Sequence, residues 1–590
     1  MIGTHVISDP VFDALAAGGG GPEAVRLLRQ ARRSRNLLLL RRILDGPCAA
    51  AAEPAADLLA RVERAAPAVA RSVIDASSFG TWAARAASDC PAHRHAGCTA
   101  RDLGALAAVA AVRAGLGTEI TVPVHDGTLR LPGLGTATRL GPVGEALVVV
   151  TTRPEAHPGP DGPPPGPRPT RFPGCQVDIR LPGEVRPLPR DPGRAGHDWQ
   201  PVAFLEARHR GLALRVPLET ADPRLPSLDT ASARPAAWQE LLRSAWRLLV
   251  DSHPGRAEEL AAGLGGIVPL PAPARGVTSA TSRHAFGTVL ASWPADPDRL
   301  ALTLLHEFQH SKLSALADLV ILHEPDGRPR LYAPWRPDPR PPAGLLQGIY
   351  AHLGDLAFWQ HRSASLPEPE RADAAWRLAL TRAQAERGVT EAASRLRLTR
   401  LGARFLDRAA RTVRAVSPDP GPARVAARVE AGVEAVWRLR WAEADGTGIK
   451  QLAELWRARL PAGALPADDI RPASGPVSGP GPEFGRWAAK QRGAHRAPPA
   501  REAAEAVAAQ PDRAERWAGL AASAAEERLP GAGVLRRRTE VVRDLYRELT
   551  TDGGTPEEAR PPDPLALAAW LAGAPVAREA GAGPGQSTGV

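Results

Sequence analysis

The pattern His306-Glu307-Phe308-Gln309-His310 constrains this chain more than any other feature of its sequence. Because an α-helix has about 3.6 residues per turn, two histidines four positions apart lie one above the other on the same helix face. Their imidazole nitrogens can bind one divalent cation, with Glu307 facing the same open coordination position. The alternative is a solvated helix face that carries two histidines by chance.

The residues around the pattern predict a helix with one buried side, which favours the metal site over that alternative. Asp296 followed by Pro297 is a good N-cap and first helical residue. Beneath the histidines runs an apolar stripe of Leu300, Leu304, Phe308 and Leu313. A helix that buries one side and keeps three ionisable groups on one turn indicates a metal site.

Two histidines need at least one further protein ligand. The first candidate is His352, which lies in a second expected helix from Gly344 to Gln360. Asp355, one turn later on that helix, and His284, upstream of the motif, compete with it. Three protein ligands leave coordination positions open, which indicates a reactive metal rather than a structural one.

Two chemistries are compatible with such a centre, and the spacing of the ligands leaves both open. Zn²⁺ would lower the pKa of a bound water, and Glu307 would accept its proton during amide hydrolysis. Fe²⁺ would instead leave room for a 2-oxo acid and O₂. Such a cosubstrate needs a cation for its distal carboxylate, and Arg336 or Arg340, on a proline-stiffened loop, can supply one. The alternative is two exposed arginines in an arginine-rich chain.

Composition narrows the protein class. A chain of 590 residues is long enough for several domains, and its hydrophobic fraction of 44% is typical of globular proteins. The net charge of +10 comes from arginines spread along the chain, without a basic patch interleaved with aromatic residues. We therefore expect no nucleic-acid partner. The start of the chain does not resemble a signal peptide, and no apolar run approaches a membrane span, so we expect a soluble cytoplasmic protein.

The four cysteines are too few and too scattered for a disulfide framework, which favours a reducing compartment. Cys90, His93, His95 and Cys98 lie close together and have side chains that bind zinc. Their spacing fits none of the usual structural zinc patterns, and the intervening Pro91 and Gly97 favour an ordinary loop, although a metal site stays open here.

Changes in hydrophobic periodicity predict the organisation of the chain. A long helix from Pro22 is expected to bury Val25, Leu28 and the leucines of 37–40. From Glu119 the period becomes two, and Asp126-Gly127 indicates a hairpin with a type I′ turn. The expected segments are an N-terminal helical layer (1–117), a β-rich module (118–225), a metal-site core (235–360), a helical region (361–460), a Pro/Gly-rich linker (461–500), a C-terminal helical region (501–579) and a disordered tail (580–590).

Four separated motifs together resemble the HExxH-motif peptide-modification family. They are GVTSATSRHAFG at 276–287, HEFQHSKL at 306–313, WRPDPRP at 335–341 and GIYAH at 348–352. The family occurs in gene clusters for ribosomally made, post-translationally modified peptides. Its members are regarded as iron- and 2-oxoglutarate-dependent peptide β-hydroxylases. The resemblance is strongest over about 270–360.

The resemblance implies hydroxylation of a β-carbon in a precursor peptide. His306, His310 and His352 would hold Fe²⁺, and Arg336 or Arg340 would bind 2-oxoglutarate, with O₂ as the second cosubstrate.

The resemblance also implies that Glu307 lines the open site instead of acting as a hydrolytic base. Ser282, Arg283 and His284 would contact substrate or cosubstrate. We expect an α+β fold that is mainly helical, with a zincin-like HExxH helix, an edge strand and a separate β-rich module. The strand over 285–292, which leads directly into the motif helix, is expected to be the sheet edge that pairs with an extended peptide.

Two other functions stay open. One is a zinc metallopeptidase with Glu307 as the general base. The other is a non-catalytic peptide-binding protein that associates with another peptide maturase.

Overall fold

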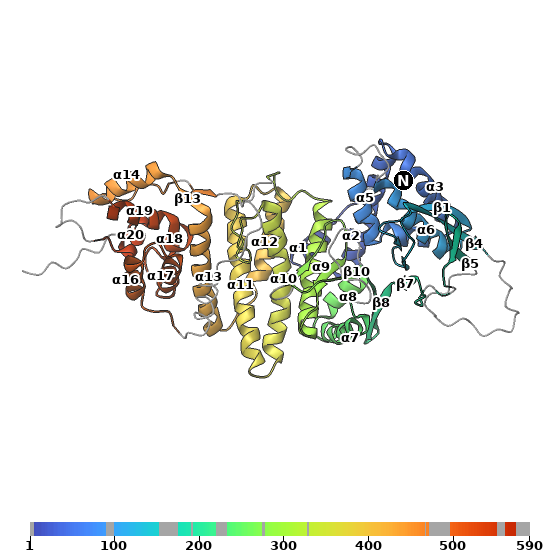
Figure 1. The fold of residues 1–590 in the computed structure, drawn as a ribbon. Helices are drawn as coiled ribbons and strands as arrows, with labels where there is room; N and C mark the ends of the chain where they lie inside the picture. Colours follow the sequence, from blue (N-terminus) through green and yellow to red (C-terminus); the bar gives the residue numbers. More distant parts are fainter. Residues whose placement is uncertain are drawn as a thin grey trace, which may run out of the picture. The chain divides into compact units, whose positions relative to one another are not determined.

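The computed structural model describes residues 5–89, 99–152, 175–189, 191, 193–219, 233–273, 278–326, 330–466, 468–470, 496–551 and 561–573. The chain divides into two compact units, Met1–Ile321 and Leu322–Val590. Figure 1 colours the first from blue to green and the second from yellow-green to red. The boundary falls inside the predicted metal-site core of 235–360, so His306 and His310 belong to the first unit and His352 to the second. Among the described helices, none has both the length and the apolar character needed to cross a membrane.

The fold is α+β, as expected, with a helical part and separate sheets. The first unit combines a helical layer with three sheets. Its helices are α1 (Asp9–Ala16), α2 (Gly21–Leu44), α3 (Ala49–Ala65), α4 (Pro67–Ile74), α5 (Ser77–Asp89), the 3-10 helix η1 (Thr99–Asp102), α6 (Leu103–Ala114), α7 (Pro235–Ser252), α8 (Pro254–Gly263) and α9 (Pro297–Ala317).

Two antiparallel sheets form the β-rich module. The four-stranded sheet has the order β1-β4-β5-β6, with β1 (Thr118–Pro123), β4 (Glu145–Thr152), β5 (Cys175–Leu181) and β6 (Glu184–Pro187). The three-stranded sheet has the order β2-β3-β7, with β2 (Leu129–Leu131), β3 (Gly135–Ala137) and β7 (Trp199–Pro201).

The predicted turn is confirmed between β1 and β2, although beyond His125 and Thr128 the two strands pair with β4 and β3 and not with each other. Asp126 and Gly127 both have positive φ, 49° and 66°, and His125 bridges to Thr128. Positive φ at both central residues is the requirement of a type I′ turn, which aspartate and glycine meet at low cost.

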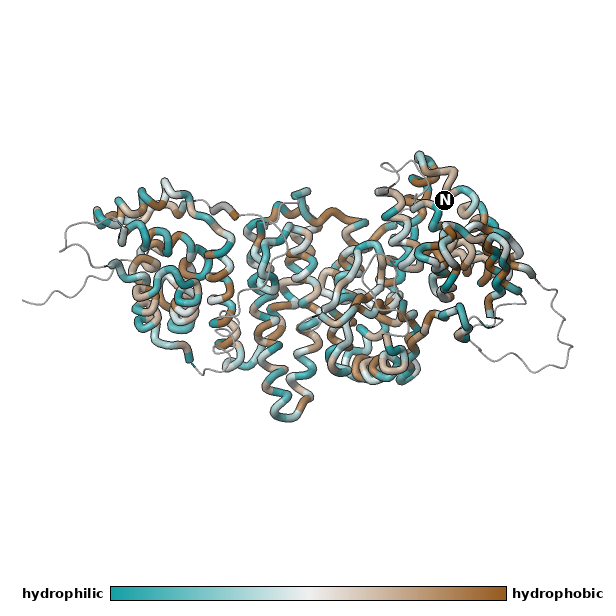
Figure 2. Tube along the Cα trace, viewed as in Figure 1, coloured by the Kyte–Doolittle hydropathy of each residue, from teal (hydrophilic) through white to brown (hydrophobic). Residues whose placement is uncertain are grey.

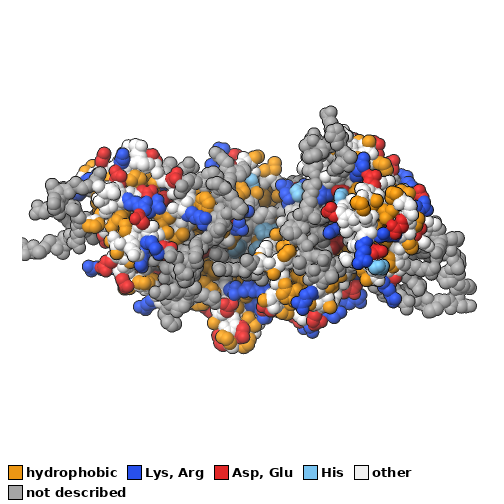
Figure 3. All heavy atoms as spheres, in the orientation of Figure 1, with side chains coloured by type: hydrophobic (Ala, Val, Ile, Leu, Met, Phe, Trp, Pro, Cys, Tyr) orange, Lys and Arg blue, Asp and Glu red, His pale blue; other side chains and the backbone are white. Residues whose placement is uncertain are grey.

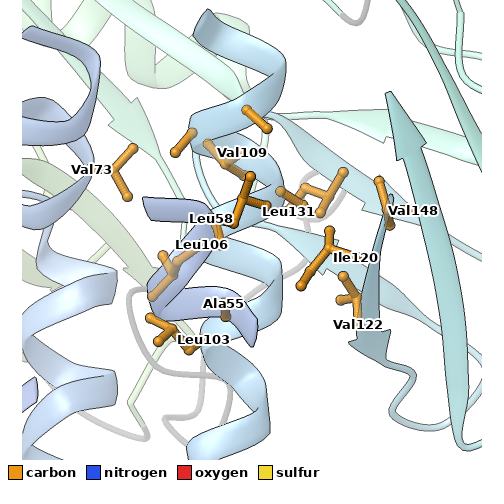
Figure 4. Packing of buried hydrophobic residues seen from close by; sticks show 14 of the residues in the cluster. Ala55, Leu58, Val73, Leu103, Leu106, Val109, Ile120, Val122, Leu131 and Val148 are labelled. Carbon is orange, nitrogen blue, oxygen red and sulfur yellow. The ribbon is translucent and has the colours of Figure 1, made fainter. Parts of the chain in front are cut away.

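A shared apolar core joins the helical layer to the β-rich module. α6 packs against both α3 and β1. Figure 4 shows Leu58 of α3 and Val109 of α6 in this core, together with Ile120 of β1 and Val148 of β4. The alternating buried and exposed residues of β1 and β2 explain the period of two in the sequence.

A five-stranded mixed sheet carries the HExxH helix. Its strands, in spatial order, are β11 (Ser279–Ala280), β12 (Thr288–Ser292), β10 (Gly266–Leu270), β9 (Leu212–Leu218) and β8 (Ala203–His209). β8 and β9 therefore belong to this sheet and not to the two sheets of the β-rich module. β12 runs parallel to β10 and antiparallel to β11.

The prediction that the strand before the motif helix is the sheet edge is wrong. β12 is buried at every residue and is paired on both sides, while the edge is the two-residue, exposed strand β11. A strand in the interior of a sheet that is covered on both faces has no exposed side. Its sequence therefore tends to be a continuous run of apolar or small residues without alternation. The edge itself is too short to produce an alternating pattern.

Helix α2 buries polar residues beside the expected apolar ones. Val25 and Leu28 are buried as predicted. Leu37, Leu39 and Leu40 are partly buried and pack against the core, whereas Leu38 is 53% exposed. Arg32 and Asn36 are about 5% exposed or less, held by an ion pair and by a hydrogen bond to the backbone.

The described residues of the second unit are helical apart from one short pair of strands. Its elements are α10 (Pro342–Ser365), α11 (Glu370–Arg395), α12 (Arg400–Arg414), α13 (Pro420–Trp441), β13 (Ala442–Ala444), α14 (Gly446–Arg457), β14 (Asp468–Ile470), α16 (Ala500–Ala509), α17 (Ala514–Glu526), α18 (Ala532–Arg537), α19 (Thr539–Thr551) and α20 (Pro564–Leu571). α10 packs against α11, α11 against α13, and α13 against α17. Figure 2 shows the alternation of hydrophobic and hydrophilic residues along α10 and α11 that such packing requires.

The predicted linker of 461–500 contains a strand. β14 pairs with β13 in antiparallel register, and Ile470 lies opposite Ala442. Residues 471–495, the predicted tail of 580–590 and all of 154–173 lie outside the described residues.

Candidate functional site

Helix α9 begins where the sequence predicts. The side chain of Asp296 accepts a hydrogen bond of 2.8 Å from the backbone N–H of Arg299, and Pro297 is the first helical residue. The four residues of the predicted apolar stripe are all buried, with exposed fractions of 2% or less. The buried stripe fixes which way the rest of the helix faces.

His306 and His310 lie side by side on α9. Their ring centroids are 5.0 Å apart, the rings are nearly perpendicular, and both side chains are partly exposed. Neighbouring imidazoles that remain accessible on one helix face fit a pair of metal ligands.

Glu307 is held by the edge strand and the residue that follows it. Its carboxylate is 3% exposed; Ser279 Oγ donates to Oε1 at 2.7 Å, and Thr281 Oγ1 lies 2.5 Å from Oε2. Thr281 Oγ1 also lies 3.1 Å from the backbone carbonyl of Glu307. Both carboxylate oxygens therefore have hydroxyl partners. We call Ser279 and Thr281 the hydroxyl clamp.

The opposite side of α9 is anchored to the start of the chain. The fully buried ammonium of Lys312 donates to the carbonyl oxygens of Gly18, at 2.9 Å, and Gly19, at 3.2 Å, and to the carboxylate of Glu259, at 2.6 Å. Gln309 Nε2 donates to the same Gly18 carbonyl at 3.1 Å. These contacts, the rear anchor, fix the rotation of α9 about its axis.

Burial governs the charges of this anchor. It lowers the pKa of Lys312 to about 7. Burial also raises the pKa of Glu259, but the positive charges of Lys312 and Arg256 outweigh it and keep that pKa below its ordinary value. Lys312 lies only two residues after His310, but its ammonium group holds α9 against Gly18, Gly19 and Glu259.

His352 lies in the second unit, on α10, and is 6% exposed. Its Nδ1 is 2.8 Å from the carbonyl oxygen of Gly348. Because a carbonyl only accepts, Nδ1 carries the proton and the ring lone pair resides on Nε2, the arrangement that metal-binding histidines commonly have. The indole of Trp335 packs against this imidazole with centroids 4.3 Å apart.

The donor chemistry of His352 thus fits a metal ligand, but its role as the third ligand stays a prediction. Within each unit, the described residues bring together no group of three or more His, Cys, Asp or Glu side chains that could hold a metal ion. Asp355, the competing candidate, lies on the same helix α10. Cys90, His93, His95 and Cys98 lie outside the described residues.

Arg336 and Arg340 share one carboxylate. Arg336 Nε lies 2.9 Å from Oδ1 of Asp338, and Arg340 Nη1 lies 3.2 Å from Oδ2. Burial raises the pKa of Asp338, but the hydrogen bonds and charges of the two arginines lower it overall. Arg336 also borders a groove of about 590 Å³ in the second unit, together with Trp335 and Trp437. A cosubstrate carboxylate would have to compete with Asp338, and 2-oxoglutarate binding here stays a prediction.

Ser282, Arg283 and His284 lie between β11 and β12. Ser282 Oγ accepts the backbone N–H of His284 at 3.3 Å, and Arg283 is 66% exposed. Burial, together with the charges of Arg35, Arg283 and Arg32, lowers the pKa of His284 to about 4. His284 is therefore neutral near pH 7. It points to Arg35 of α2, with Nδ1 3.2 Å from Arg35 Nη2, rather than standing as an isolated ligand.

Two polar features escaped the sequence-based prediction. The first is a group of arginines on α2, Arg29, Arg32, Arg33 and Arg35, whose helical spacing could have revealed it.

The second is the partly buried group of Arg113, Gly133 and Glu219, which lines a cavity of about 440 Å³. The backbone N–H of Gly133 donates to Glu219 at 3.0 Å, while Arg113 Nη2 donates to the carbonyl of Gly133 at 3.1 Å. Burial raises the pKa of Glu219 to about 7. These residues come from three distant segments, so no local pattern could identify them.

In comparisons of the sequence with known proteins, no family model matches and no curated protein is significantly similar.

Proposed function

We propose that the protein is an Fe(II)- and 2-oxoglutarate-dependent hydroxylase that acts on a β-carbon of a residue in a precursor peptide. The reaction would convert peptide, 2-oxoglutarate and O₂ into hydroxylated peptide, succinate and CO₂. The motifs resembling the peptide-modification family supply the hypothesis. The hydroxyl clamp on Glu307 is the observation in the structure that supports it most directly.

The clamp bears on the choice between hydroxylation and hydrolysis. A general base must be within hydrogen-bond reach of the water it deprotonates. Glu307 is buried, and each of its carboxylate oxygens already accepts a hydroxyl hydrogen bond. Such a carboxylate is suited to fixing the helix against the edge strand. His306 and His310 meanwhile remain partly exposed, which leaves them accessible to a metal ion.

In this proposal His306 and His310 hold the metal with His352, and bound iron supplies the oxidising chemistry. The chain's own residues would position the reactants. β11 lies at the sheet edge and can pair with an extended peptide backbone. Arg336 or Arg340 would hold the distal carboxylate of the cosubstrate.

The test is an anaerobic reconstitution with Fe²⁺ and 2-oxoglutarate, followed by addition of O₂ and a precursor peptide encoded beside the gene. We expect one oxygen atom to be added to the peptide, measured by mass spectrometry, and an equal amount of succinate. His306→Ala and His310→Ala should abolish both products.

Glu307→Gln separates this proposal from a zinc peptidase, because the amide cannot take up a proton from water. A hydroxylase should retain its rate within about tenfold, whereas loss of a general base costs roughly 10²–10⁴-fold. Peptide cleavage without 2-oxoglutarate would establish the peptidase. Peptide maturation that is unaffected by His306→Ala would instead indicate a non-catalytic binding partner.

A further inference from the structure

Three arginines of the first unit gather around a single carboxylate. Arg32 donates to Asp318, Arg35 Nε lies 3.4 Å from its Oδ2, and Arg283 Nη2 lies 3.6 Å from its Oδ1. Arg32 and Arg35 come from α2, and Asp318 directly follows α9. His284 completes the cluster through its contact with Arg35.

The cluster carries more positive charge than its acidic partner can balance. The neighbouring carboxylate of Asp75 is already paired with Arg29 and Arg33, so it has no spare negative charge for the cluster. Burial and the charges of adjacent arginines lower the pKa of both Arg32 and Arg35, although Asp318 opposes this. His284, being neutral, adds no balancing charge. A folded chain that holds guanidinium groups so close together incurs an electrostatic cost, which an anionic ligand would relieve.

An unpartnered donor points to the same conclusion. Among the described residues, Arg35 Nη1 is buried and has no hydrogen-bond partner. A buried donor on a guanidinium that already faces an aspartate requires a further acceptor.

The placement of Arg283 gives a ligand access. Its side chain is 66% exposed, whereas that of Arg35 is 22% exposed and that of Arg32 is 5% exposed. Exposure in the cluster therefore increases from Arg32, which is buried, through Arg35 to Arg283, which is open to solvent. Guanidinium groups bind carboxylates with paired, charge-assisted hydrogen bonds, which makes a carboxylate the best-matched ligand.

We propose that Arg35 and Arg283, supported by Arg32, form a carboxylate-binding site in the first unit. The ligand is either a small dicarboxylate or an acidic group of a peptide, since both present the same chemistry to the arginines. Asp318 orders the guanidinium groups and occupies one side of the cluster. The site depends on these contacts alone and does not require the proposed hydroxylation to be correct.

The test is isothermal titration calorimetry of the full-length protein in metal-depleted buffer without carboxylate chelators. One arm uses 2-oxoglutarate, and another uses a hexapeptide rich in glutamate. A third uses the same hexapeptide with glutamine in place of glutamate. Binding of the first or the second probe, with no binding of the third, identifies the source of the carboxylate.

The variants Arg35→Ala and Arg283→Ala should weaken binding by about tenfold or more, since each removes charge-assisted hydrogen bonds. Arg26→Ala, at an exposed position of the same helix, changes the net charge equally and should leave affinity unchanged within about twofold. Arg283→Lys should also weaken binding because the planar fork is lost.

Arg283 is exposed, so its truncation leaves the fold intact, which thermal unfolding of the variant verifies. The proposal is overturned if neither carboxylate probe binds the wild-type protein, or if Arg26→Ala weakens binding as much as Arg283→Ala. A protein that binds carboxylate through this site but hydroxylates no peptide would refute the proposed function and leave the site established.

Discussion

At the scale of single residues, the side chain that distinguishes the candidate chemistries is Glu307. Its identity and its place between two histidines are evident in the sequence. Its partners are not, because Ser279 and Thr281 belong to a strand of two residues and to the residue beyond it. Side-chain hydroxyls that come from another element produce no periodic pattern in the sequence of the helix. The hydroxyl clamp therefore could not be predicted from the sequence.

Removing the clamp should destabilise the protein. Ser279→Ala combined with Thr281→Val leaves the buried carboxylate of Glu307 without its hydroxyl donors, which costs about 1–3 kcal/mol per unsatisfied group. Urea denaturation followed by circular dichroism measures this. Ser88→Ala, which removes an exposed hydroxyl on α5, is the control and should change stability by less than about 0.5 kcal/mol. Equal stabilities of the clamp variant and this control would contradict the assigned role.

His284 should make the first unit sensitive to acid. Its folded-state pKa is about 4, whereas an unfolded histidine has a pKa of about 6.5. Between these values the unfolded chain binds more protons, so the unfolding free energy falls as the pH decreases from about 6.5 to about 4. Thermal unfolding of wild type and His284→Asn over this window checks the effect. The difference in stability between the two proteins should shrink or reverse as the pH falls, and a difference independent of pH would contradict it.

At the scale of elements, α9 shows how much the sequence could predict. Its start, its N-cap and its buried stripe are local features, and all are confirmed. The interior position of β12 and the buried polar face of α2 depend on which strands and charges come from elsewhere in the chain. Local patterns carry no such information. The same reasoning explains why the pair of histidines was predictable, whereas the meeting of the α2 arginines with Arg283 and Asp318 was not.

The N-cap of α9 offers a small, well-defined test. Asp296→Ala removes the acceptor for the backbone N–H of Arg299 and should lower stability by about 1 kcal/mol. Asp296→Asn keeps a capping oxygen and should be nearly neutral. Urea denaturation of the three proteins gives both values, and equal losses in the two variants would show that the cap itself contributes little.

The rear anchor should be far more costly to break. Lys312→Met removes the ammonium partner of the buried Glu259 carboxylate and leaves Arg256, 3.3 Å away, as a remaining cation. The loss should therefore lie toward the lower end of the about 3–5 kcal/mol that breaking a buried pair costs. Adding Glu259→Gln removes the carboxylate that is then only partly compensated, so the double variant should be more stable than Lys312→Met alone. Thermal unfolding of the three variants tests this order. A double variant that is the least stable of the three would contradict the pairing.

At the scale of the whole molecule, the chain is two compact units, and the predicted ligand set draws on both. The sequence supplies His352 as a candidate ligand, while the structure supplies the orientation of its ring and the tautomer. The unit boundary divides the stretch in which the resembling motifs are concentrated, so it could not be inferred from the motifs.

Metal binding by the intact protein tests the ligand set. His352→Ala should weaken Fe²⁺ binding more than the roughly 10–100-fold that loss of a ligand's hydrogen-bond partner costs. His361→Ala, on the same helix α10, should leave affinity unchanged. Anaerobic titration calorimetry gives the affinities. If His352→Ala binds Fe²⁺ as wild type does while His306→Ala does not, the third ligand is a different residue.

The rear anchor also has a consequence for the order of synthesis. Lys312 contacts carbonyls that precede it by 294 and 293 residues in the chain. Gly18 and Gly19 therefore leave the ribosome long before the helix that docks on them, and the segments that form its seat are made first. A shortened protein that lacks its first 20 residues would keep every histidine of the motif and lose the place where their helix comes to rest.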